Sequence, residues 1–509
     1  MPPVVPPNAS DMRDQTRQGF TGLAGELYRE LDTHRPELRE LVDRFGDLSC
    51  AEYGSSFFAP DQGVSTILAE VSRKHAEKLH GPEVAAQVSE TLRRCSSICT
   101  GEHAAFLGDA MQFQSALQLA AGAAARKVPV VVSVPFGNVP LDNSSTRSGC
   151  VPWQSRLYRF TRNKRDAQRA LVFGSPALTR DYLASRFDDE TFAKIAHMFP
   201  DEIFDERLRY LGDQFAVANR VLWKRTLGDI PGIGSFVQIP AEELVTSLLA
   251  ESFERRDLFQ QMIFEPHYRK QYLQRFEGIR SCHRDPRAPR PFGTHFFWGR
   301  SPKSGRQIHY FFDDHDEDLL RPLVASQGRM VEPGAKHDAE PLRLTAGTEE
   351  EVLARLQDKN LVPSVFLSLS LLATHGATNN GGYQQTEYFK QVKRTMVEFL
   401  RCNPELDDRE HFGTDRAHWQ GIRTDGFCLG PLFLKEQGAI SSLDSLWSLP
   451  PQERHRRVFE ALNSTSFWQA VRLGATQFYA SIVQDAPYSI PELLGLRAGE
   501  VKELRTVTD

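Results

Sequence analysis

The sequence has little cysteine and no long apolar segment, and both shortages exclude classes of protein. Its 509 residues include seven cysteines at irregular spacings, an odd number that indicates reduced thiols rather than a disulfide framework. The longest apolar run, at 362–373, is too short to span a bilayer. The proline-rich start, interpreted as a loose tail over 1–14, lacks the basic flank and apolar core of a secretory signal. We therefore expect a cytoplasmic protein with no membrane partner.

A concentration of charge of one sign is also missing. The 61 lysines and arginines nearly balance the 66 aspartates and glutamates, which leaves a net charge of -5. Nucleic-acid phosphates bind to concentrated basic surfaces, and the densest basic cluster, at 162–165, is interpreted as a solvated helix end. The sequence therefore predicts no nucleic-acid partner, and we expect small-molecule substrates.

The signatures of common nucleotide, hydrolase and metal sites are absent. The sequence contains no G-x-x-x-x-G-K-[ST], G-x-G-x-x-G, G-x-S-x-G or H-E-x-x-H motif. Cys95 and Cys99 are spaced more widely than the cysteines of redox and zinc pairs, and we interpret them as buried structural thiols. The acidic run at 313–318 follows a strand-like segment and is interpreted as a solvated hairpin tip. We expect neither a cofactor nor a metal ion.

Two segments have the order of elements of an α/β unit. In the first, a candidate strand at 96–100 and a polar loop at 100–103 precede a helix, and the apolar run at 128–136 follows. Because this run is rich in β-branched residues and bounded by Pro and Gly, it predicts a strand buried on both faces. In the second, the apolar segment 362–373 leads through a glycine pair into a helix over 384–400. Both patterns predict a parallel sheet covered by helices.

Most of the remaining chain has the periodicity of amphipathic helices. A proline just before residue 241 and the glutamates after Thr348 mark two helix starts. Aromatic-rich runs between 295 and 312, joined by a Pro/Gly/Ser turn, predict a β-hairpin instead. The other predicted helices span 15–45, 64–79, 82–92, 158–198, 201–227, 241–253, 451–463 and 465–484.

The best candidate site residues stand at two loop-to-helix junctions. In open parallel sheets, ligands bind at the loops that lead from a strand into a helix. At the first junction, His103 has a side chain that exchanges protons near neutral pH, and Glu102 can orient it or accept a proton. The structural alternative is a helix cap, with Glu102 near a helix start and His103 bonded to the backbone.

The second junction contains a glycine pair and several amides. Gly381 and Gly382 permit close approach of the backbone, and the N–H groups of a helix start suit an anion such as a carboxylate or phosphate. Gln385 in the helix and Asn380 before it supply donors and acceptors. A glycine-rich lead-in is often only a turn, but two such junctions in separate α/β segments favour a shared cleft.

The order and spacing of these motifs resemble the bacillithiol synthase family, the enzymes that add cysteine to glucosaminyl malate. In that family a GQQxGLxxGPLY loop leads into a helix and a VPVxPxF strand, and a GPGExxYxxxLK element follows later. Here 100–109 and 128–136 are similar to the first two elements, and 381–390 follows in the place of the third. The resemblance extends in patches over 50–400 and implies a Rossmann-like core.

The chain departs from that family at residues that carry chemistry. The acidic EDHD element is replaced by 137–143, in which Asp142 alone is a counterpart. The first-loop glutamines become Glu102 and His103, and the glutamate of the second glycine motif aligns with Gln385. The long C-terminal coiled coil that pairs subunits is not found, so homo-oligomer formation stays open. We expect a distant relative with altered chemistry and do not carry over the family's substrates.

At 509 residues the chain is long for a single core. We predict an α/β fold with a Rossmann-like parallel sheet core, large helical insertions, a small β-hairpin region and a helical C-terminal lobe. The expected regions are an N-terminal tail and helices (1–50), the first half of the core (51–175), a helical insertion (176–282), the β-hairpin region (283–345), the second half of the core with the glycine-rich loop (346–430) and a C-terminal helical region (431–509).

The expected function is that of a small-molecule biosynthetic enzyme, a ligase or transferase that joins an amine or thiol nucleophile to an anionic or activated acceptor. His103 and Glu102 would move protons, and Gly381 and Gly382 would hold the anionic group of the acceptor. An amino acid is the expected class of nucleophile, and three residues would position it: Gln385, Asn380 and Asp142. Two alternatives stay open, a binding protein on the same fold that has lost catalysis and a hydrolase that uses water as the nucleophile.

Overall fold

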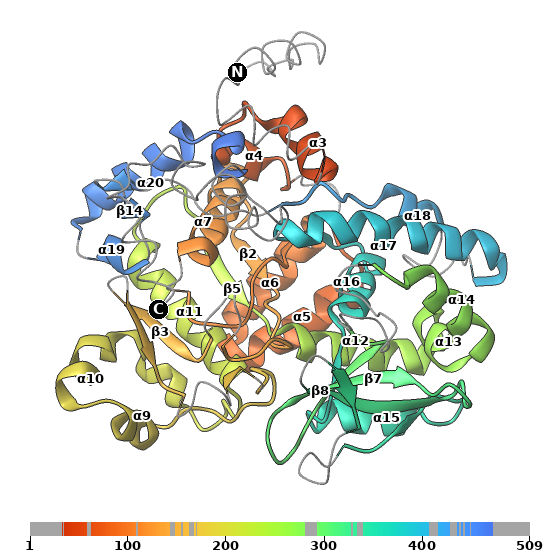
Figure 1. Cartoon of the computed structure of the whole chain (residues 1–509). Coiled ribbons are helices and arrows are strands. Elements are labelled where there is room, and N and C mark those ends of the chain that lie inside the picture. The colour runs from red at the N-terminus through yellow and green to blue at the C-terminus, as the bar shows by residue number, and fades with distance from the viewer. Residues whose placement is uncertain are drawn as a thin grey trace.

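The computed structural model has a four-stranded parallel sheet at its centre (Figure 1). It describes residue 33 and residues 35–471 apart from 59–62, 108–109, 143–147, 154–155, 162–166, 169, 280–292, 327–328, 333–338, 407–415, 428–434, 437–438, 441–442 and 448. The strands of the sheet are β1 (Ser97–Cys99), β2 (Val130–Ser133), β5 (Ser235–Gln238) and β12 (Thr378–Asn380). They lie in the order β12-β1-β2-β5, and each neighbouring pair is parallel.

Helices cover both faces of this sheet, because successive side chains of a strand point to opposite sides. The helices concerned are α5 (Thr66–His80), α6 (Pro82–Arg94), α7 (Ala110–Ala125), α11 (Leu211–Leu227), α12 (Ala241–Arg255) and α16 (Val365–Thr374). Val131 of β2 packs in one hydrophobic core with α7 and α11, whereas Val130 and Val132 pack in another with α5, α6, α12 and α16. The prediction of a strand buried on both faces is therefore confirmed for β2.

The helix predicted over 158–198 is wrong in its first part. β3 (Cys150–Trp153) and β4 (Arg156–Arg159) form an antiparallel pair, in which Tyr158 lies opposite Val151. This pairing with a neighbouring strand overrides the helical period of the segment. The later helical elements of this part are α9 (Arg180–Arg186), α10 (Asp189–Ile195), η1 (Ala196–Met198) and η2 (Asp201–Phe204), and α11 begins at Leu211 rather than at 201.

The β-hairpin predicted between 295 and 312 is confirmed. β6 (Phe297–Arg300) pairs antiparallel with β7 (Gln307–Phe312), and Trp298 lies opposite His309. The acidic run 313–318 forms the turn into the next antiparallel strand, as predicted. The same sheet contains β8 (Leu319–Ser326), β9 (Arg329–Val331), β10 (Leu342–Arg343) and β11 (Leu361–Pro363).

The second α/β segment also has its predicted helix. α17 (Tyr383–Cys402) covers the predicted range 384–400, while the apolar segment 362–373 divides between β11 and α16. α15 (Glu349–Gln357) follows Thr348 as predicted, but the hydroxyl of Thr348 donates to the carbonyl of Arg343 and does not cap the helix. Other helices of this half are α13 (Leu258–Phe264), α14 (Pro266–Phe276), η3 (Pro404–Leu406) and α18 (Arg416–Gly421).

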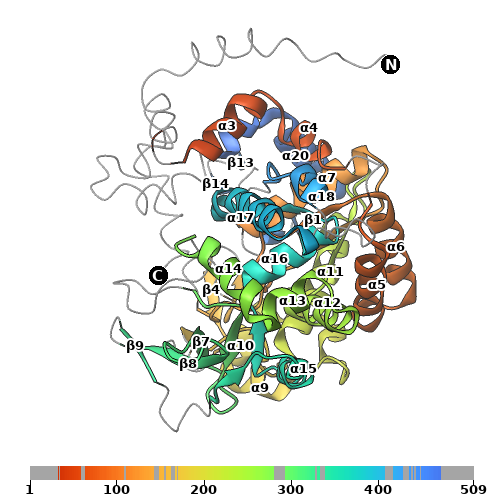
Figure 2. The ribbon, with the colours of Figure 1, turned by 90° about the vertical axis from the view of Figure 1, so that its right-hand side faces the viewer.

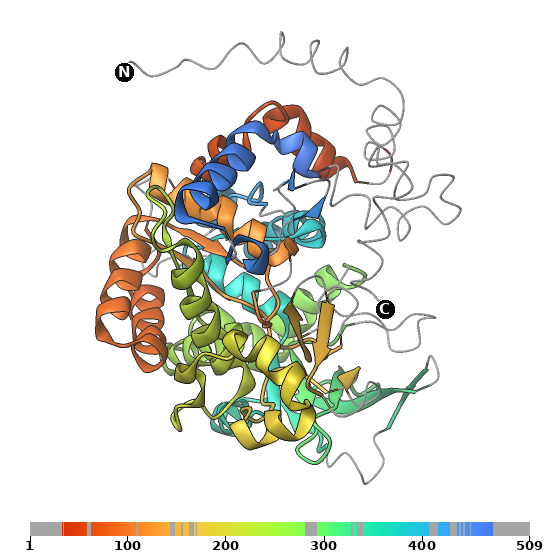
Figure 3. The ribbon, with the colours of Figure 1, turned by 90° about the vertical axis from the view of Figure 1, so that its left-hand side faces the viewer.

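The N-terminal and C-terminal helices pack against each other (Figure 2, Figure 3). The N–H of Cys50, in α4 (Cys50–Ser55), donates to the carbonyl of Thr465, just beyond α20 (Pro451–Ser464). Leu446 and Leu462 share the hydrophobic core of α7 and α11, so the described C-terminal helices join the core around the sheet. This part also contains α3 (Pro36–Phe45), β13 (Lys435–Glu436), β14 (Ala439–Ile440) and α19 (Leu443–Trp447). The tail and helix predicted within 1–32 and the helical residues predicted beyond 471 lie outside the described residues.

α4 and α7 approach each other closely at two glycines. A Cβ atom built on Gly122 of α7 would lie 2.3 Å from the carbonyl carbon of Gly54 in α4. A Cβ atom on Gly54 would lie 2.6 Å from the carbonyl oxygen of Gln118. Since these neighbours are backbone atoms, a larger residue at either position would force the two helices apart.

Two further expectations concern the thiols and the membrane. Cys95 and Cys99 are buried, as predicted, and burial raises the pKa of the Cys95 thiol. Such a thiol is a poor nucleophile at neutral pH.

None of the described helices is both long and apolar enough to cross a membrane.

Candidate functional site

The two predicted junctions lie side by side at the carboxyl ends of β1 and β12. Cys99 ends β1 opposite Asn380, which ends β12, and the N–H of Thr100 donates to the carbonyl of Asn380 at 2.8 Å. The helices that follow these strands enter different hydrophobic cores, α7 one core and α17 the other. The two connections therefore part at this point, and open parallel sheets bind ligands at such a switch point.

Side chains and backbone connect the two junctions directly. The amide Nε2 of Gln385, in the first turn of α17, donates to the hydroxyl of Thr100 at 2.9 Å. A Cβ atom on Gly382 would lie 3.9 Å from the carbonyl oxygen of Gly101, and one on Gly381 would lie only 2.0 Å from Cδ of Gln385. Gly381 is therefore required where it stands, because a side chain there would displace the amide that joins the junctions.

Glu102 follows Thr100 and Gly101 in the first junction and is buried, with 1% of its surface exposed. Its Oε2 accepts hydrogen bonds from the hydroxyl of Ser133 at 2.6 Å and from Nε2 of Gln238 at 2.7 Å. Burial raises the pKa of the carboxyl group to about 7, although hydrogen bonds from the side chains of Ser133, Gln238 and Cys99 act in the opposite direction. Oε1, the other oxygen of the carboxyl group, is buried as well.

A second buried amide holds Gln238 in the orientation that Glu102 needs. Nδ2 of Asn219, in α11, donates to Oε1 of Gln238 at 2.7 Å, so the Gln238 amide must present its N–H group to Glu102. Asn219 also accepts from the N–H of Leu107 and donates to the carbonyl of Ala105, which fixes the loop after Glu102. The carboxyl group and its loop are therefore positioned by one connected set of buried polar groups.

The sequence analysis did not single out Ser133, Gln238 or Asn219. Ser133 and Gln238 are the polar last residues of the otherwise buried strands β2 and β5. A polar residue at the carboxyl end of a buried strand is a usable signal, because such ends border the ligand site of a parallel sheet. Asn219 lies in the middle of a helix and offers no comparable signal.

The interpretation of Glu102 as a helix cap is wrong. α7 begins only at Ala110, and the Glu102 carboxylate bonds to side chains of β2 and β5 instead of to the helix. His103 is half-buried, and its backbone forms a parallel bridge with Phe136. Burial lowers the pKa of the imidazole to about 4, so the ring is neutral and a weak base near pH 7. Of the two predicted catalytic residues, Glu102 has the pKa that suits proton transfer at neutral pH.

The remaining two candidates are Asn380 and Asp142. Asn380 donates through Nδ2 to the hydroxyl of Ser97 at 2.8 Å and to the carbonyl of Ile98, so it ties β12 to β1. Asp142 forms an ion pair with Arg159 at 3.5 Å, and its N–H donates to the carbonyl of Ala167. Its role in positioning a nucleophile stays a prediction.

Glu242 is a second buried carboxyl group at this edge of the sheet. It stands in the first turn of α12 and accepts from the N–H groups of Gly137 at 2.7 Å and Asn138 at 2.8 Å. Burial raises its pKa to about 7, against the effect of these backbone hydrogen bonds. Because both donors belong to the loop after β2, Glu242 fixes that loop in place.

The chemistry open to the junctions is proton transfer and anion binding. Within the described part of the chain, no group of three or more His, Cys, Asp or Glu side chains could hold a metal ion. The first junction offers a carboxyl group with a pKa near neutrality, and the second offers the start of α17, whose N-cap Gly382 makes no side-chain cap. The carboxyl group can accept a proton, and the N–H groups at the start of the helix can hold an anion.

Comparison with known proteins adds no relative. No family model matches the sequence, and no curated protein and no solved structure matches the chain. The resemblance to the bacillithiol synthases therefore stays a prediction from the sequence, and the function is argued from the site itself.

Proposed function

We propose that the protein is a small-molecule biosynthetic enzyme that forms a C–N or C–S bond by adding an amine or thiol nucleophile to an anionic or activated acceptor. The observation that carries this proposal is Glu102, a buried carboxyl group with a pKa of about 7, two residues after the Thr100 that bonds to Gln385 of the other junction. Numbered along the chain, the strand order β5-β2-β1-β12 is 3-2-1-4. A Rossmann-like sheet begins with this order and binds its ligand between strands 1 and 4.

In this proposal Glu102 is the proton acceptor. Passing a proton from an ammonium or thiol group to a carboxylate with a pKa of about 7 costs about 3.4 kcal/mol less than passing it to a glutamate with the ordinary pKa of 4.5. Burial of Glu102 therefore makes it the better base for an amine or thiol, and the deprotonated nucleophile then attacks the acceptor as its leaving group departs.

The acceptor's anionic group would bind at the start of α17. This helix runs for 20 residues from Tyr383 to Cys402 and has no acidic residue in its first turn and no side-chain cap. Its first N–H groups and its dipole therefore favour a carboxylate or phosphate. Gly381 and Gly382 keep side chains away from this position, and Gln385 lies in the first turn of the helix.

The test is a coupling assay with mass-spectrometric detection. Purified protein is incubated with mixtures of amino acids and small thiols, each combined with a panel of anionic and activated acceptors. We expect a product whose mass equals nucleophile plus acceptor minus the leaving group. The variant Glu102→Gln should lose at least about 100-fold of this activity, the lower range for loss of a general base.

The matched control is Glu90→Gln on α6, where the same chemical change is made on a side chain that is 60% exposed. It should form product at the wild-type rate. Product formation by Glu102→Gln within two-fold of wild type would contradict the proposed role of Glu102. The absence of a coupled product for every pair, or a product in which water replaces the nucleophile, would contradict the proposed reaction.

A further inference from the structure

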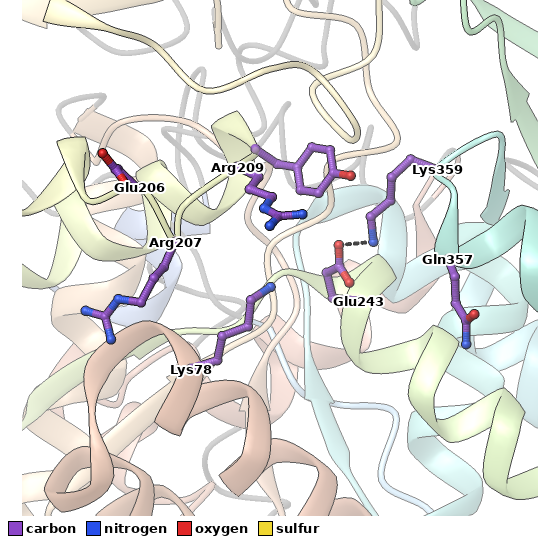
Figure 4. A pocket seen from close by; sticks show the side chains of 8 residues that line it. Lys78, Glu206, Arg207, Arg209, Glu243, Gln357 and Lys359 are labelled. Atoms are coloured by element: carbon purple, nitrogen blue, oxygen red, sulfur yellow. Dashed lines mark ion pairs between the residues drawn. The ribbon is translucent and has the colours of Figure 1, made fainter.

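A cavity of about 600 Å³ lies beside the start of α12, away from the two junctions. Its walls come from separate parts of the chain: the end of α5, the segment that leads into α11, the first turn of α12, and the residues after α15. Figure 4 shows Lys78, Arg209 and Lys359 with their charged ends directed toward one shared space, which Glu243 also faces. The lining also includes Glu206 and Arg207, and Arg207 forms an ion pair with Asp205. Three of the four lining cations, from three different elements, thus face this space.

Lys359 is held in an unusual way for a lysine. Its φ angle of 63° lies in the left-handed region that residues other than glycine seldom adopt, and only 6% of its surface is exposed. The amine forms an ion pair with Glu243 and lies 5.1 Å and 5.4 Å from the ring centres of Phe173 and Tyr210. This φ angle belongs to the turn that ends α15, in which the N–H of Asn360 donates to the carbonyl of Arg355. The ion pair and the two rings fix the Lys359 amine at the wall of the cavity.

Of the other two cations, Lys78 has a carboxylate partner and Arg209 has none among the described residues. The nearest carboxylate oxygen to the Lys78 amine is that of Asp213, at 3.7 Å, and 49% of the Lys78 side chain is exposed. Within the described residues Arg209 makes no ion pair. Glu243 is already matched by Lys359, and Asp213 by Lys78, so Arg209 remains as a positive charge that faces the cavity without a counter-ion.

A further cation, Arg300, lies near the base of the Lys359 side chain. Nε of the half-buried Arg300 has no hydrogen-bond partner among the described residues. A Cβ atom on Gly174 would lie within 3.0 Å of Cβ of Lys359 and of Cδ and Nε of Arg300, so the Arg300 side chain runs beside the base of the Lys359 side chain. Their summed field favours an anion in the cavity.

We propose that this cavity is a binding site for a small molecule that carries a compact oxyanion, a phosphate or a carboxylate. Arg209 and Lys78 contact the oxyanion, Lys359 supports it from the buried wall, and the ring of Tyr210 covers the organic part of the molecule. The cavity and Glu102 are connected through the loop after β2, since Phe136 bonds to the backbone of Glu102 and Phe173 to that of Gly137. The site does not depend on the reaction proposed for Glu102.

The experiment is a calorimetric titration of the whole protein with inorganic phosphate, pyrophosphate and malate at constant ionic strength. We expect saturable binding of at least one of these anions, and comparison of the phosphates with malate tells a phosphate site from a carboxylate site. The variant Arg209→Gln should raise the dissociation constant at least about ten-fold, as expected for loss of a charge-assisted hydrogen bond. Because Arg209 is exposed, this change should leave the fold intact.

Arg93→Gln is the matched control, because Arg93 is an exposed arginine on α6, outside the cavity. It should bind the anion as the wild type does, and so should Glu102→Gln. Absence of saturable binding for all three anions would overturn the proposal, and so would an unchanged dissociation constant in Arg209→Gln. Neither result affects the coupling assay, so the two proposals fail separately.

Discussion

Replacement of Glu102 by glutamine should change how the stability of the protein depends on pH. The glutamate binds its proton more tightly in the native protein than in the unfolded chain, because burial raises its pKa from 4.5 to about 7. The stability that it contributes is fully present below pH 4.5 and is lost as the pH rises through about 7. Glutamine cannot ionise, so the stability of Glu102→Gln should not fall with pH for this reason.

The size of the effect follows from the pKa shift. A rise from 4.5 to about 7 corresponds to about 3 kcal/mol in full, at 1.36 kcal/mol per pKa unit. Between pH 5 and pH 8.5, about 2.5 kcal/mol of this stabilisation of the native protein is lost. Any constant cost of placing an amide beside Ser133 and Gln238 cancels, because only the change with pH is used.

The measurement is urea unfolding of wild type and Glu102→Gln at several pH values from 5 to 8.5. The free energy of unfolding of the variant, relative to wild type, should increase steadily with pH. Glu90→Gln, which alters an exposed side chain, should show no such trend. A difference between Glu102→Gln and wild type that changes by less than about 0.5 kcal/mol over this range would refute the argument, because it would mean that burial does not raise the pKa of Glu102.

Two glycine substitutions test the close approaches described above. Gly381→Ala places a Cβ atom 2.0 Å from Cδ of Gln385 and should lower the free energy of unfolding by about 1–3 kcal/mol, whereas Gly382→Ala, with its nearest atom at 3.9 Å, should cost much less. Equal effects in a urea titration would contradict this reading. Gly122→Ala brings a Cβ atom to 2.3 Å from Gly54 and should lower the thermal midpoint by several degrees in calorimetry; an unchanged midpoint would show that α4 and α7 separate without cost.

Local patterns were sufficient for the parts of the fold that depend on near neighbours. The apolar run at 128–136 predicted β2, and the aromatic runs between 295 and 312 predicted the β6–β7 hairpin. Both predictions were possible because a strand buried on two faces and a hairpin with a short turn each require particular residue types at neighbouring positions. The position of the two junctions was also predictable, since loops at the carboxyl ends of parallel strands meet at one edge.

Other features depend on contacts that the local sequence does not encode. Gln238 reaches Glu102 across 136 residues of chain, and no periodicity reports such a pair. The same holds for the pKa values of Glu102 and His103, which burial shifts in opposite directions. Residue type alone favoured His103 as the base, whereas the packed environment favours Glu102. The helical period around Tyr158 predicted a helix, whereas the segment forms strand β4 because it pairs with β3. That pairing is also a contact that the local pattern does not encode.

The pairing of β1 with β12 has a consequence for how the protein is made. The hydrogen bond between Thr100 and Gln385 joins residues 285 apart in the chain, and a ribosome needs about 15 to 60 s to synthesise that length. During this interval one edge of β1 has no strand beside it and is open to non-native pairing. The two junctions meet only after the glycine pair and α17 have been synthesised. Shortened chains that end before β12 would therefore contain Glu102 without the site, and we expect them to need chaperones rather than to act on substrates.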